Sequence, residues 1–373
     1  MTLHIFNPEH DIALASNLSN FTAPHAGRQL RNDLGFLPAL WAEDGDQILV
    51  EHEESSIKAY YRVCHRLEKL GITASHSSRS VQLLSKKRPF SHQETACIQP
   101  WGWDKAIRRE LERMGFSEPL LPTMELTERI RMLSHRRTSA QLLPQLQTEG
   151  TVGEAFECTT YDEVAELLNR YGRLVLKAPW SSSGRGVRFC DAVRLVNGEE
   201  LVMKNWVRNV INTQGSMMAE PYFNKVKDFG MEFSADDEGH IHYLGLSLFH
   251  TVNGAYEGNI LATESTKMGI ISRYIPVDLL ENIKQNIISK LNLDGYVGPF
   301  GVDMMICAAE RLKDNEETTN DKRCLLHPCV EINLRRTMGH VALCISPTDD
   351  DIRGVMRVIY DDNHYKLKIN KLR

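Results

Sequence analysis

The hydrophobic pattern of the first third of the chain alternates between short apolar runs and longer segments of helical periodicity. The apolar runs, each followed by a turn-forming residue, predict strands at 3–6, 46–51 and 96–99. The segments at 60–70 and 105–114 carry apolar residues at helical spacing. Because the strands alternate with helices, this part of the chain is expected to form a small parallel-sheet α/β domain.

Further along the chain, strands that are either apolar or alternate between polar and apolar residues are separated by helical segments. The strands are expected at 174–176, 187–190, 216–220, 240–250, 301–306 and 330–335. The helices are expected at 125–146, 159–171, 199–209, 276–291 and 349–359. The charge-dense segment 309–323 predicts a solvated hairpin tip or mobile loop, and the basic end from Lys366 predicts a solvated tail.

Composition adds the class of protein to this picture. A chain of 373 residues with 42% hydrophobic and 25% charged residues is typical of a soluble protein of two or three domains. A net charge of −5 argues against a general nucleic-acid binder. No apolar run is long enough to span a membrane, and the N-terminus lacks the pattern of a secretory signal, so we expect a cytoplasmic protein. The eight scattered cysteines are expected to be free thiols.

A lysine followed by a serine- and glycine-rich loop is the first candidate for chemistry. The strand at 174–176 places Lys177 at its end, on the same face as Val175. The loop that follows carries small residues, namely Ser182, Ser183, Gly184 and Gly186. Small residues let backbone N–H groups approach an anion closely, and the lysine adds a positive charge. The loop therefore predicts a polyphosphate site; the alternative is an ordinary turn with a solvated lysine.

Two alternating strands near the C-terminus present oxygen ligands. In the strand at 330–335, Glu331, Asn333 and Arg335 share the polar face. In the strand at 301–306, Asp303 lies opposite an apolar face. Carboxylate and amide oxygens are ligands of Mg²⁺ when it also holds substrate phosphates. A surface hairpin would alternate in the same way, but it would not need this set of polar residues, so a metal site is the favoured interpretation.

Taken together and in this order, four motifs resemble those of the ATP-grasp superfamily. They are the loop after Lys177, the segment from Glu220 to Phe223, Asp303, and the segment from Glu331 to Arg335. The likeness is strongest to the carboxylate–amine ligases, such as D-alanine–D-alanine ligase and the amino-acid ligases, and covers roughly residues 120 to 345. It implies an α/β and α+β fold, in which an N-terminal parallel-sheet domain precedes a two-lobed ATP-grasp unit. The expected domains are 1–118, a central lobe at 119–222 and a C-terminal lobe at 223–373.

The resemblance also implies roles for individual residues. The implied ATP-binding residues are Arg136, Lys177, Ser182, Ser183, Gly184, Gly186, Glu220, Phe223 and Glu232. Among these, Arg136 or its neighbour Arg137 takes the place of a phosphate-binding lysine, Glu220 and Phe223 would contact adenine, and Glu232 would bind the ribose. The implied Mg²⁺ ligands are Asp303, Glu331 and Asn333, and Arg335 is the implied catalytic residue.

The function implied by the resemblance is ATP- and Mg²⁺-dependent joining of a carboxylate to an amine through an acyl phosphate. The expected partners are small carboxylate and amine substrates, including amino acids or peptides, and a second copy of the chain; no nucleic acid or membrane is expected. Two alternatives remain open, namely a kinase-type phosphotransferase on the same fold and a non-catalytic nucleotide-binding regulatory protein. Neither a P-loop nor a dinucleotide-binding fingerprint is present to compete for the nucleotide.

Two further groups of polar residues are left with alternatives. Glu9, His10 and Asp11 follow the first expected strand, so they could face a crevice at the sheet edge or simply cap a helix. His327 lies between Cys324 and Cys329, but no second pair of ligands stands at a spacing typical of a zinc site.

Overall fold

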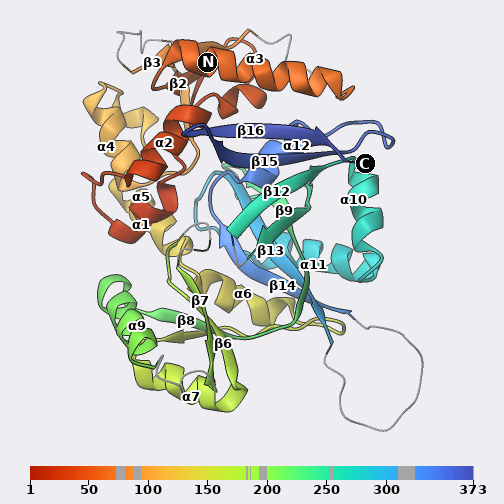
Figure 1. Ribbon diagram of the computed structural model, residues 1–373. Coiled ribbons are helices and arrows are strands. Elements are labelled where there is room, and N and C mark those ends of the chain that lie inside the picture. The colour runs from red at the N-terminus through yellow and green to blue at the C-terminus, as the bar shows by residue number, and fades with distance from the viewer. Residues whose placement is uncertain are drawn as a thin grey trace.

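A computed structural model describes the protein over residues 1–72, 80–86, 94–181, 184, 186–192, 200–252, 255–309 and 324–372. The predictions for Ser182, Ser183 and residues 310–323 lie outside these described residues. Within them, the strands form four sheets of four strands each (Figure 1).

The N-terminal sheet has the order β3-β2-β1-β4, and every neighbouring pair is parallel. Its strands are β1 (Thr2–Ile5), β2 (Gln47–Val50), β3 (Gln82–Ser85) and β4 (Cys97–Pro100). Its helices are α1 (His10–Ser16), α2 (His25–Leu34), α3 (Glu53–Lys69) and α4 (Lys105–Arg113), with 3-10 turns η1 (Leu37–Leu40) and η2 (Glu118–Leu120). The prediction of a parallel-sheet α/β unit at the N-terminus is confirmed.

A small antiparallel sheet of order β5-β8-β6-β7 forms the second unit, at the lower left of Figure 1. Its strands are β5 (Phe156–Cys158), β6 (Arg173–Lys177), β7 (Val187–Asp191) and β8 (Met217–Pro221), and its helices are α7 (Tyr161–Tyr171) and α9 (Glu200–Gln214). Helix α7 begins at a capping box of Thr160 and Glu163 and ends at Gly172. Apolar residues of both helices pack on one face of this sheet, so the unit has its own core.

The third sheet has the antiparallel order β10-β9-β13-β14. Its strands are β9 (Lys225–Ala235), β10 (Ile241–Ser247), β13 (Gly298–Ala308) and β14 (Cys324–Asn333). The helices packed near it are α5 (Met124–Leu133), α6 (Arg137–Leu146), α10 (Glu264–Ile271), α11 (Val277–Lys290) and α12 (Met338–Cys344). Ile130 of α5 and Leu142 of α6 are buried in the same core as Phe233 and Phe300. The helices at 124–146 therefore pack against this sheet and its core.

The fourth sheet corrects two predictions for the C-terminus. It has the order β11-β12-β15-β16, with β11 (Phe249–Val252), β12 (Ala255–Leu261), β15 (Gly354–Asp361) and β16 (His364–Lys371). The predicted helix at 349–359 and the predicted solvated tail from Lys366 are both wrong, because these segments pair as a hairpin. The hairpin turn is made by Asp362 and Asn363, whose φ angles of 56° and 59° suit the two-residue turn that joins right-twisted strands.

The C-terminal hairpin also packs against the N-terminal unit. Met356 and Ile369 are buried in one cluster with Phe36 and Leu67. Figure 1 shows β15 and β16 lying beneath α2 and α3. The first and last parts of the chain thus share a core, which holds the N-terminal sheet against the rest of the molecule.

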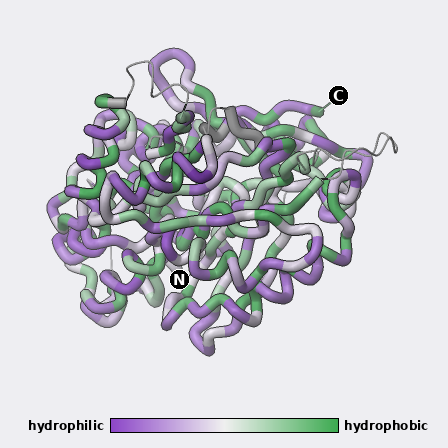
Figure 2. The backbone as a smooth tube through the Cα atoms, turned by 90° about the horizontal axis from the view of Figure 1, so that it is seen from below, coloured by the Kyte–Doolittle hydropathy of each residue, from purple (hydrophilic) through white to green (hydrophobic). Residues whose placement is uncertain are grey.

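The outer helices alternate hydrophilic and hydrophobic residues along the chain, as Figure 2 shows. No helix in the described ranges is long and apolar enough to cross a membrane. None of the eight cysteines, all of which lie in described residues, forms a disulfide.

Candidate functional site

Lys177 and Glu220 form an ion pair across two neighbouring strands of the small sheet. Lys177 ends β6, and Glu220 lies near the end of β8, which pairs with β6 in antiparallel register. The lysine Nζ lies 2.6 Å from Glu220 Oε2, and both side chains are buried. A buried ion pair holds the lysine in place at the start of the loop, since either charge alone would be costly to desolvate.

The loop between β6 and β7 is closed by backbone hydrogen bonds and by an arginine. The N–H of Ala178 donates to Gly186 O at 2.8 Å, and the N–H of Val187 donates to Gly184 O at 3.1 Å. Gly184 has a φ of +73°, a conformation that favours glycine. A Cβ at Gly186 would overlap the side chain of Ser181, so this glycine is required for the close approach of the two loop strands.

Arg136 connects this loop to the strand that carries the predicted metal ligands. It lies just before α6 and is buried, and its Nη1 donates to Ala178 O and, at 2.8 Å, to Ser181 Oγ. Its Nη2 donates to Glu331 Oε1 of β14 at 2.7 Å. Arg137 instead pairs with Glu157 at 2.8 Å. Of the two arginines, Arg136 is therefore the one that faces the loop.

The predicted metal ligands lie side by side on β13 and β14. Asp303 is directly opposite Glu331 in the antiparallel register. Asn333 Nδ2 donates to Asp303 Oδ2 at 3.0 Å, and Asn333 Oδ1 accepts from Arg335 Nη2 at 3.0 Å. Strand β14 ends at Asn333, so Arg335 does not continue the predicted alternation. A turn with a 2.8 Å hydrogen bond from Arg335 N to Asn333 O brings its side chain back to this row.

The negative charge of the Asp303 carboxylate is unfavourable in its surroundings, and a bound cation would stabilise it. The loss of surrounding water raises the pKa of its carboxyl well above the usual range, and the nearby Glu331 and Glu232 carboxylates raise it further. Arg335 and Asn333 oppose this shift only in part. Among the described residues, no group of three or more His, Cys, Asp or Glu could hold a metal. The set at this site is two carboxylates and an amide, which suits a cation that also takes oxygens from a ligand.

Asp303→Asn is expected to make the ligand-free protein more stable at neutral pH. A carboxyl whose pKa is higher in the folded than in the unfolded chain destabilises the folded state at high pH. The destabilisation begins as the pH passes the pKa of the unfolded chain and is complete above the pKa of the folded chain. Because the raised pKa penalises the charged carboxyl in the folded state, we expect the free energy of unfolding of Asp303→Asn at neutral pH to exceed that of the wild type. Urea unfolding at pH 7 checks this, with Asp237→Asn, at an exposed position, as the control. Lower stability of Asp303→Asn would contradict the electrostatic account.

The N-terminal segment reaches this site, an outcome that the sequence left open. Asp11 Oδ1 and Oδ2 accept from Arg335 Nε and Nη2 at 2.9 and 2.8 Å. Glu9 precedes α1 but makes no side-chain capping bond, and it pairs with Arg31 instead. His10 Nδ1 lies 3.0 Å from Asp104 Oδ2, and its ring is 1% exposed. These three residues therefore contact other elements rather than the end of their own helix.

Glu232, which the resemblance implies as a ribose ligand, is buried against the start of α12. It is 2% exposed, and its Oε2 accepts from Thr337 Oγ1 at 2.9 Å and lies 3.0 Å from His340 Nδ1. The carboxylate is enclosed by the start of α12, where Thr337 and His340 form a capping box. Because this carboxylate is almost wholly buried against α12 in the structure, the ribose role implied by the resemblance stays a prediction. The place of Glu232 in the fold is to anchor α12 on β9.

Gly339→Ala is expected to lower the free energy of unfolding by about 1–3 kcal/mol, the usual cost of overpacking a filled core. A Cβ at Gly339 would overlap the Glu232 carboxylate and the Ser247 hydroxyl. Gly269→Ala in α10 is the matched control, because a Cβ there meets nothing within 4 Å. This control should be neutral or slightly stabilising, since alanine favours helix more than glycine does. Equal urea midpoints for the two variants would show that the Glu232 contact is easily rearranged.

The segment after β8 brings an aromatic ring and a histidine together. Phe223 and His327 are in edge-to-face contact, with ring centroids 5.8 Å apart. His327 is 1% exposed, and burial together with nearby Lys177 lowers its pKa to about 3, so the ring is neutral. Neither ring nitrogen has a hydrogen-bond partner in the part of the chain that the structure describes. Together with Cys324 and Cys329 it forms no candidate metal group within the described ranges.

Comparison with known proteins gives the following findings. No family model matches the sequence, and no curated protein matches it. Among solved structures, the chain is similar to N5-carboxyaminoimidazole synthetase from Staphylococcus aureus complexed with ADP, with 12% identity and a TM-score of 0.48, over 97% of this chain and 83% of that one. It is also similar to biotin carboxylase from Campylobacter jejuni, with 12% identity and a TM-score of 0.48, over 96% of this chain and 75% of that one.

A third similar structure is the biotin carboxylase domain of 2-oxoglutarate carboxylase from Hydrogenobacter thermophilus, complexed with MgADP, ADP and bicarbonate. It shares 16% identity and has a TM-score of 0.45, over 84% of this chain and 74% of that one. The likeness concerns the arrangement of elements and assigns no residue of this chain.

Proposed function

We propose that the protein is a Mg²⁺-dependent, ATP-using ligase that joins a carboxylate to an amine. The observation that carries this proposal is the meeting of two sets of groups from different sheets. Lys177 and Arg136 supply buried positive charge beside a small-residue loop, and Asp303 and Glu331 supply facing carboxylates. The salt bridge between Arg136 and Glu331 joins the two sets directly. A cationic loop beside a pair of oxygen ligands is the arrangement that a metal-bound nucleotide triphosphate requires.

The residues present fit Mg²⁺, and Asp303, Glu331 and Asn333 would hold it. Two carboxylates that face one another across neighbouring strands repel, and a divalent cation between them removes that repulsion. The ion would supply charge neutralisation on the phosphate oxygens of the substrate. Glu331 now shares its Oε1 with Arg136, so ligand binding must divide that carboxylate between the arginine and the cation.

Lys177, Arg136 and the backbone of the loop would bind the phosphates. Arg136 already donates four hydrogen bonds through its two terminal nitrogens, and its enclosed Nε has no partner among the residues that the structure describes. Its fork therefore lies fixed against the loop before any ligand arrives, which lowers the entropy lost on binding. Lys177 is paired with Glu220, and a phosphate would share its three N–H donors with that carboxylate.

The reaction that fits these groups has two steps. A substrate carboxylate oxygen attacks the γ-phosphorus of ATP, and the bond from this phosphorus to the bridging oxygen of the β-phosphate breaks. The products of this step are ADP and an acyl phosphate. The nitrogen of the amine then attacks the acyl carbon, loses a proton and expels inorganic phosphate. Arg335, at the end of the row formed by Asp303 and Asn333, would stabilise negative charge in both steps. Amino acids or peptides are the substrates that we propose.

Screening ADP release over a matrix of acids and amines tests the proposal. A ligase releases ADP only when both an acid and an amine are present, and it yields equal amounts of amide and phosphate. ADP release with the acid alone, together with a stable phosphorylated product, would instead identify a phosphotransferase. Saturating ATP binding without ADP release for any pair would identify a regulatory binding protein. Absence of ATP binding in the presence of Mg²⁺ would overturn the proposal.

A further inference from the structure

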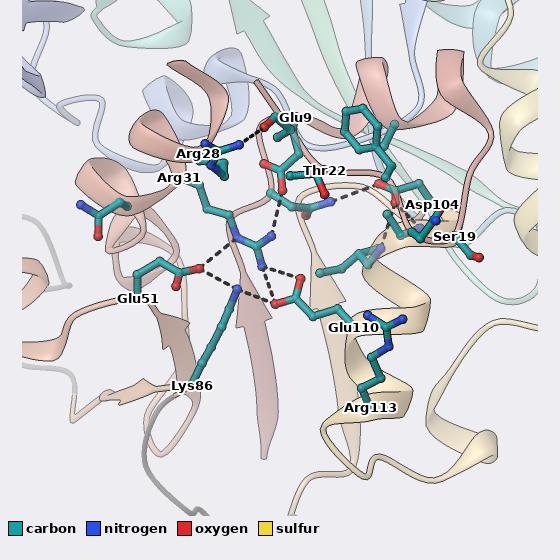
Figure 3. Close-up of a pocket in the computed structure, with 18 of the residues that line it drawn as sticks. Glu9, Ser19, Thr22, Arg28, Arg31, Glu51, Lys86, Asp104, Glu110 and Arg113 are labelled. Carbon is teal, nitrogen blue, oxygen red and sulfur yellow. Dashed lines mark hydrogen bonds and ion pairs between the residues drawn. The ribbon is translucent and has the colours of Figure 1, made fainter. Parts of the chain in front are cut away.

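A pocket of about 710 Å³ opens at the carboxyl ends of the parallel strands of the N-terminal sheet (Figure 3). Its lining includes Asn7 after β1, Glu51 directly after β2, Lys86 directly after β3 and Asp104 after β4. This edge of an open parallel sheet is where ligands bind in α/β folds, because loops there diverge and leave a crevice. The pocket shares only the segment around α1 with the site described above.

The floor of the pocket is an ion network in which carboxylates outnumber cations. Arg31 lies 2.8 Å from Glu9, 3.8 Å from Glu51 and 3.1 Å from Glu110. Lys86 pairs with Glu51 at 2.6 Å and also with Glu110. Three carboxylates therefore share two cations, and the floor carries a surplus of one negative charge. The exposed fractions of Glu51 and Glu110, 32% and 29%, leave their carboxylates open to a ligand.

Glu9 is the carboxylate of the floor whose negative charge is least compensated by hydrogen bonds and cations. Glu9 uses Oε1 for Arg31, and its enclosed Oε2 has no hydrogen-bond partner. Burial raises the pKa of Glu9, although Arg31 opposes the shift. For Glu110, by contrast, Arg31 and Lys86 outweigh burial and lower the pKa. A cationic group that enters the pocket would therefore be attracted to this floor.

The rim of the pocket has the opposite charge. Arg113 and Arg28 are exposed and stand on different sides of the opening (Figure 3). Within the described residues neither arginine has an acidic partner among the ion pairs, and Arg28 donates to Ala23 O. Arg113 follows Glu110 by three positions on α4, so their side chains lie on one helix face about 5–6 Å apart at Cβ. An acceptor for an ammonium and a donor for a carboxylate thus lie side by side.

We propose that this pocket binds a small dipolar molecule that carries a protonated primary amine next to a carboxylate, which is the chemistry of a free α-amino acid. The ammonium group of the ligand donates hydrogen bonds to Glu110 and Glu51. The carboxylate of the ligand accepts hydrogen bonds from the guanidinium of Arg113. A purely structural ion network would balance its own charges and close over them. Here the floor holds three carboxylates for two cations, and the arginines that complete the charge lie apart from it at the rim. Two of the three carboxylates are partly exposed beneath an open cavity. Binding at this pocket does not require the nucleotide reaction proposed above.

The test uses the full chain without nucleotide. Melting temperatures are measured with each common L-amino acid at millimolar concentration, and the best ligand is then titrated by calorimetry. At least one amino acid should raise the melting temperature, and its N-acetyl and carboxamide derivatives should fail, since each lacks one of the two charges. Arg113→Ala should weaken binding roughly ten- to a hundredfold, because it removes a charge-assisted hydrogen bond to the ligand carboxylate. Arg109→Ala, on the same helix but outside the pocket lining, should bind as the wild type does.

Three results would overturn the proposal. One is the absence of any shift in melting temperature with every amino acid; another is equal binding of an N-acetylated derivative. The third is an equal loss of amino-acid affinity in Arg113→Ala and Arg109→Ala. That result would show that the affinity depends on the general positive charge of the helix and not on a contact with Arg113. Glu110→Gln should also abolish binding, but it removes a partner of Arg31 and Lys86 and could unfold the protein. If Glu110→Gln is unfolded, the surface variant Arg113→Ala decides the test. Because no nucleotide is present, failure here leaves ATP binding untouched, and failure to bind ATP leaves this test valid.

Discussion

Arg335→Ala is expected to lower turnover by on the order of a hundredfold or more while ATP affinity stays close to that of the wild type. The guanidinium lies at the end of the row formed by Asp303 and Asn333, and it is anchored there by the bidentate contact to Asp11. A charge held in place before the reaction stabilises the transition state more than the bound substrate, so its loss appears in kcat. Steady-state rates and ATP titrations on the same preparation separate the two quantities.

Glu331→Gln is the matched comparison for Arg335→Ala, because it removes a proposed metal ligand from the same row. Its activity should fall and then recover in part as Mg²⁺ is raised, whereas Arg335→Ala should gain nothing from added Mg²⁺. Asp11→Asn keeps the shape of the partner of Arg335 but removes its charge, and it should have a smaller effect than Arg335→Ala. Recovery of Arg335→Ala by Mg²⁺ to the same extent as Glu331→Gln would show that the roles assigned along this row are wrong.

Local periodicity was enough to predict the two halves of the candidate site. The position of Lys177 at a strand end depends on a few neighbouring residues, as does the shared face of Glu331 and Asn333. Asp303 and Glu331 were each predicted on the polar face of a separate strand, and the register of β13 and β14 places them directly opposite one another. These features could be predicted because the side chains of a strand alternate with a period of two and because a few neighbouring residues determine a turn.

Contacts between distant parts of the chain could not be predicted in this way. The pair of Asp11 and Arg335 joins residues 324 positions apart, and no local pattern specifies it. The same holds for Glu232, whose position in an alternating strand does not reveal that α12 covers it. The hairpin of β15 and β16 is different, because the turn at 362–363 and the β-branched residues before it were a readable signal. The helical spacing of the apolar residues at 349–359 concealed that signal.

The ion network of the N-terminal pocket illustrates a further limit. Arg31 lies on α2, Glu110 on α4, and Glu51 and Lys86 directly follow two different strands. Each residue by itself is an ordinary surface charge in the sequence. Only the parallel sheet, which collects the ends of its strands at one edge, brings them into contact. The surplus of carboxylates over cations is therefore a property of the fold and has no counterpart in the composition.

Lys177→Met is expected to weaken ATP binding roughly ten- to a hundredfold, since a charge-assisted contact to phosphate contributes about 1.5–3 kcal/mol. The change also strands a carboxylate, because Glu220 is the partner of Lys177 at 2.6 Å and has a buried side chain. Removing one member of a buried pair commonly lowers stability by about 3–5 kcal/mol, so weak binding by this variant could arise from unfolding alone.

The double variant Lys177→Met with Glu220→Gln removes that ambiguity. It carries no unpaired buried charge, so its free energy of unfolding should be higher than that of the single variant. If Lys177 binds phosphate, the double variant regains stability but not ATP affinity, as measured by calorimetry in the presence of Mg²⁺. Glu220→Gln alone should keep most of its ATP affinity, because the lysine remains. Wild-type ATP affinity in the folded double variant would show that Lys177 only neutralises Glu220, and that the loop after β6 is an ordinary turn.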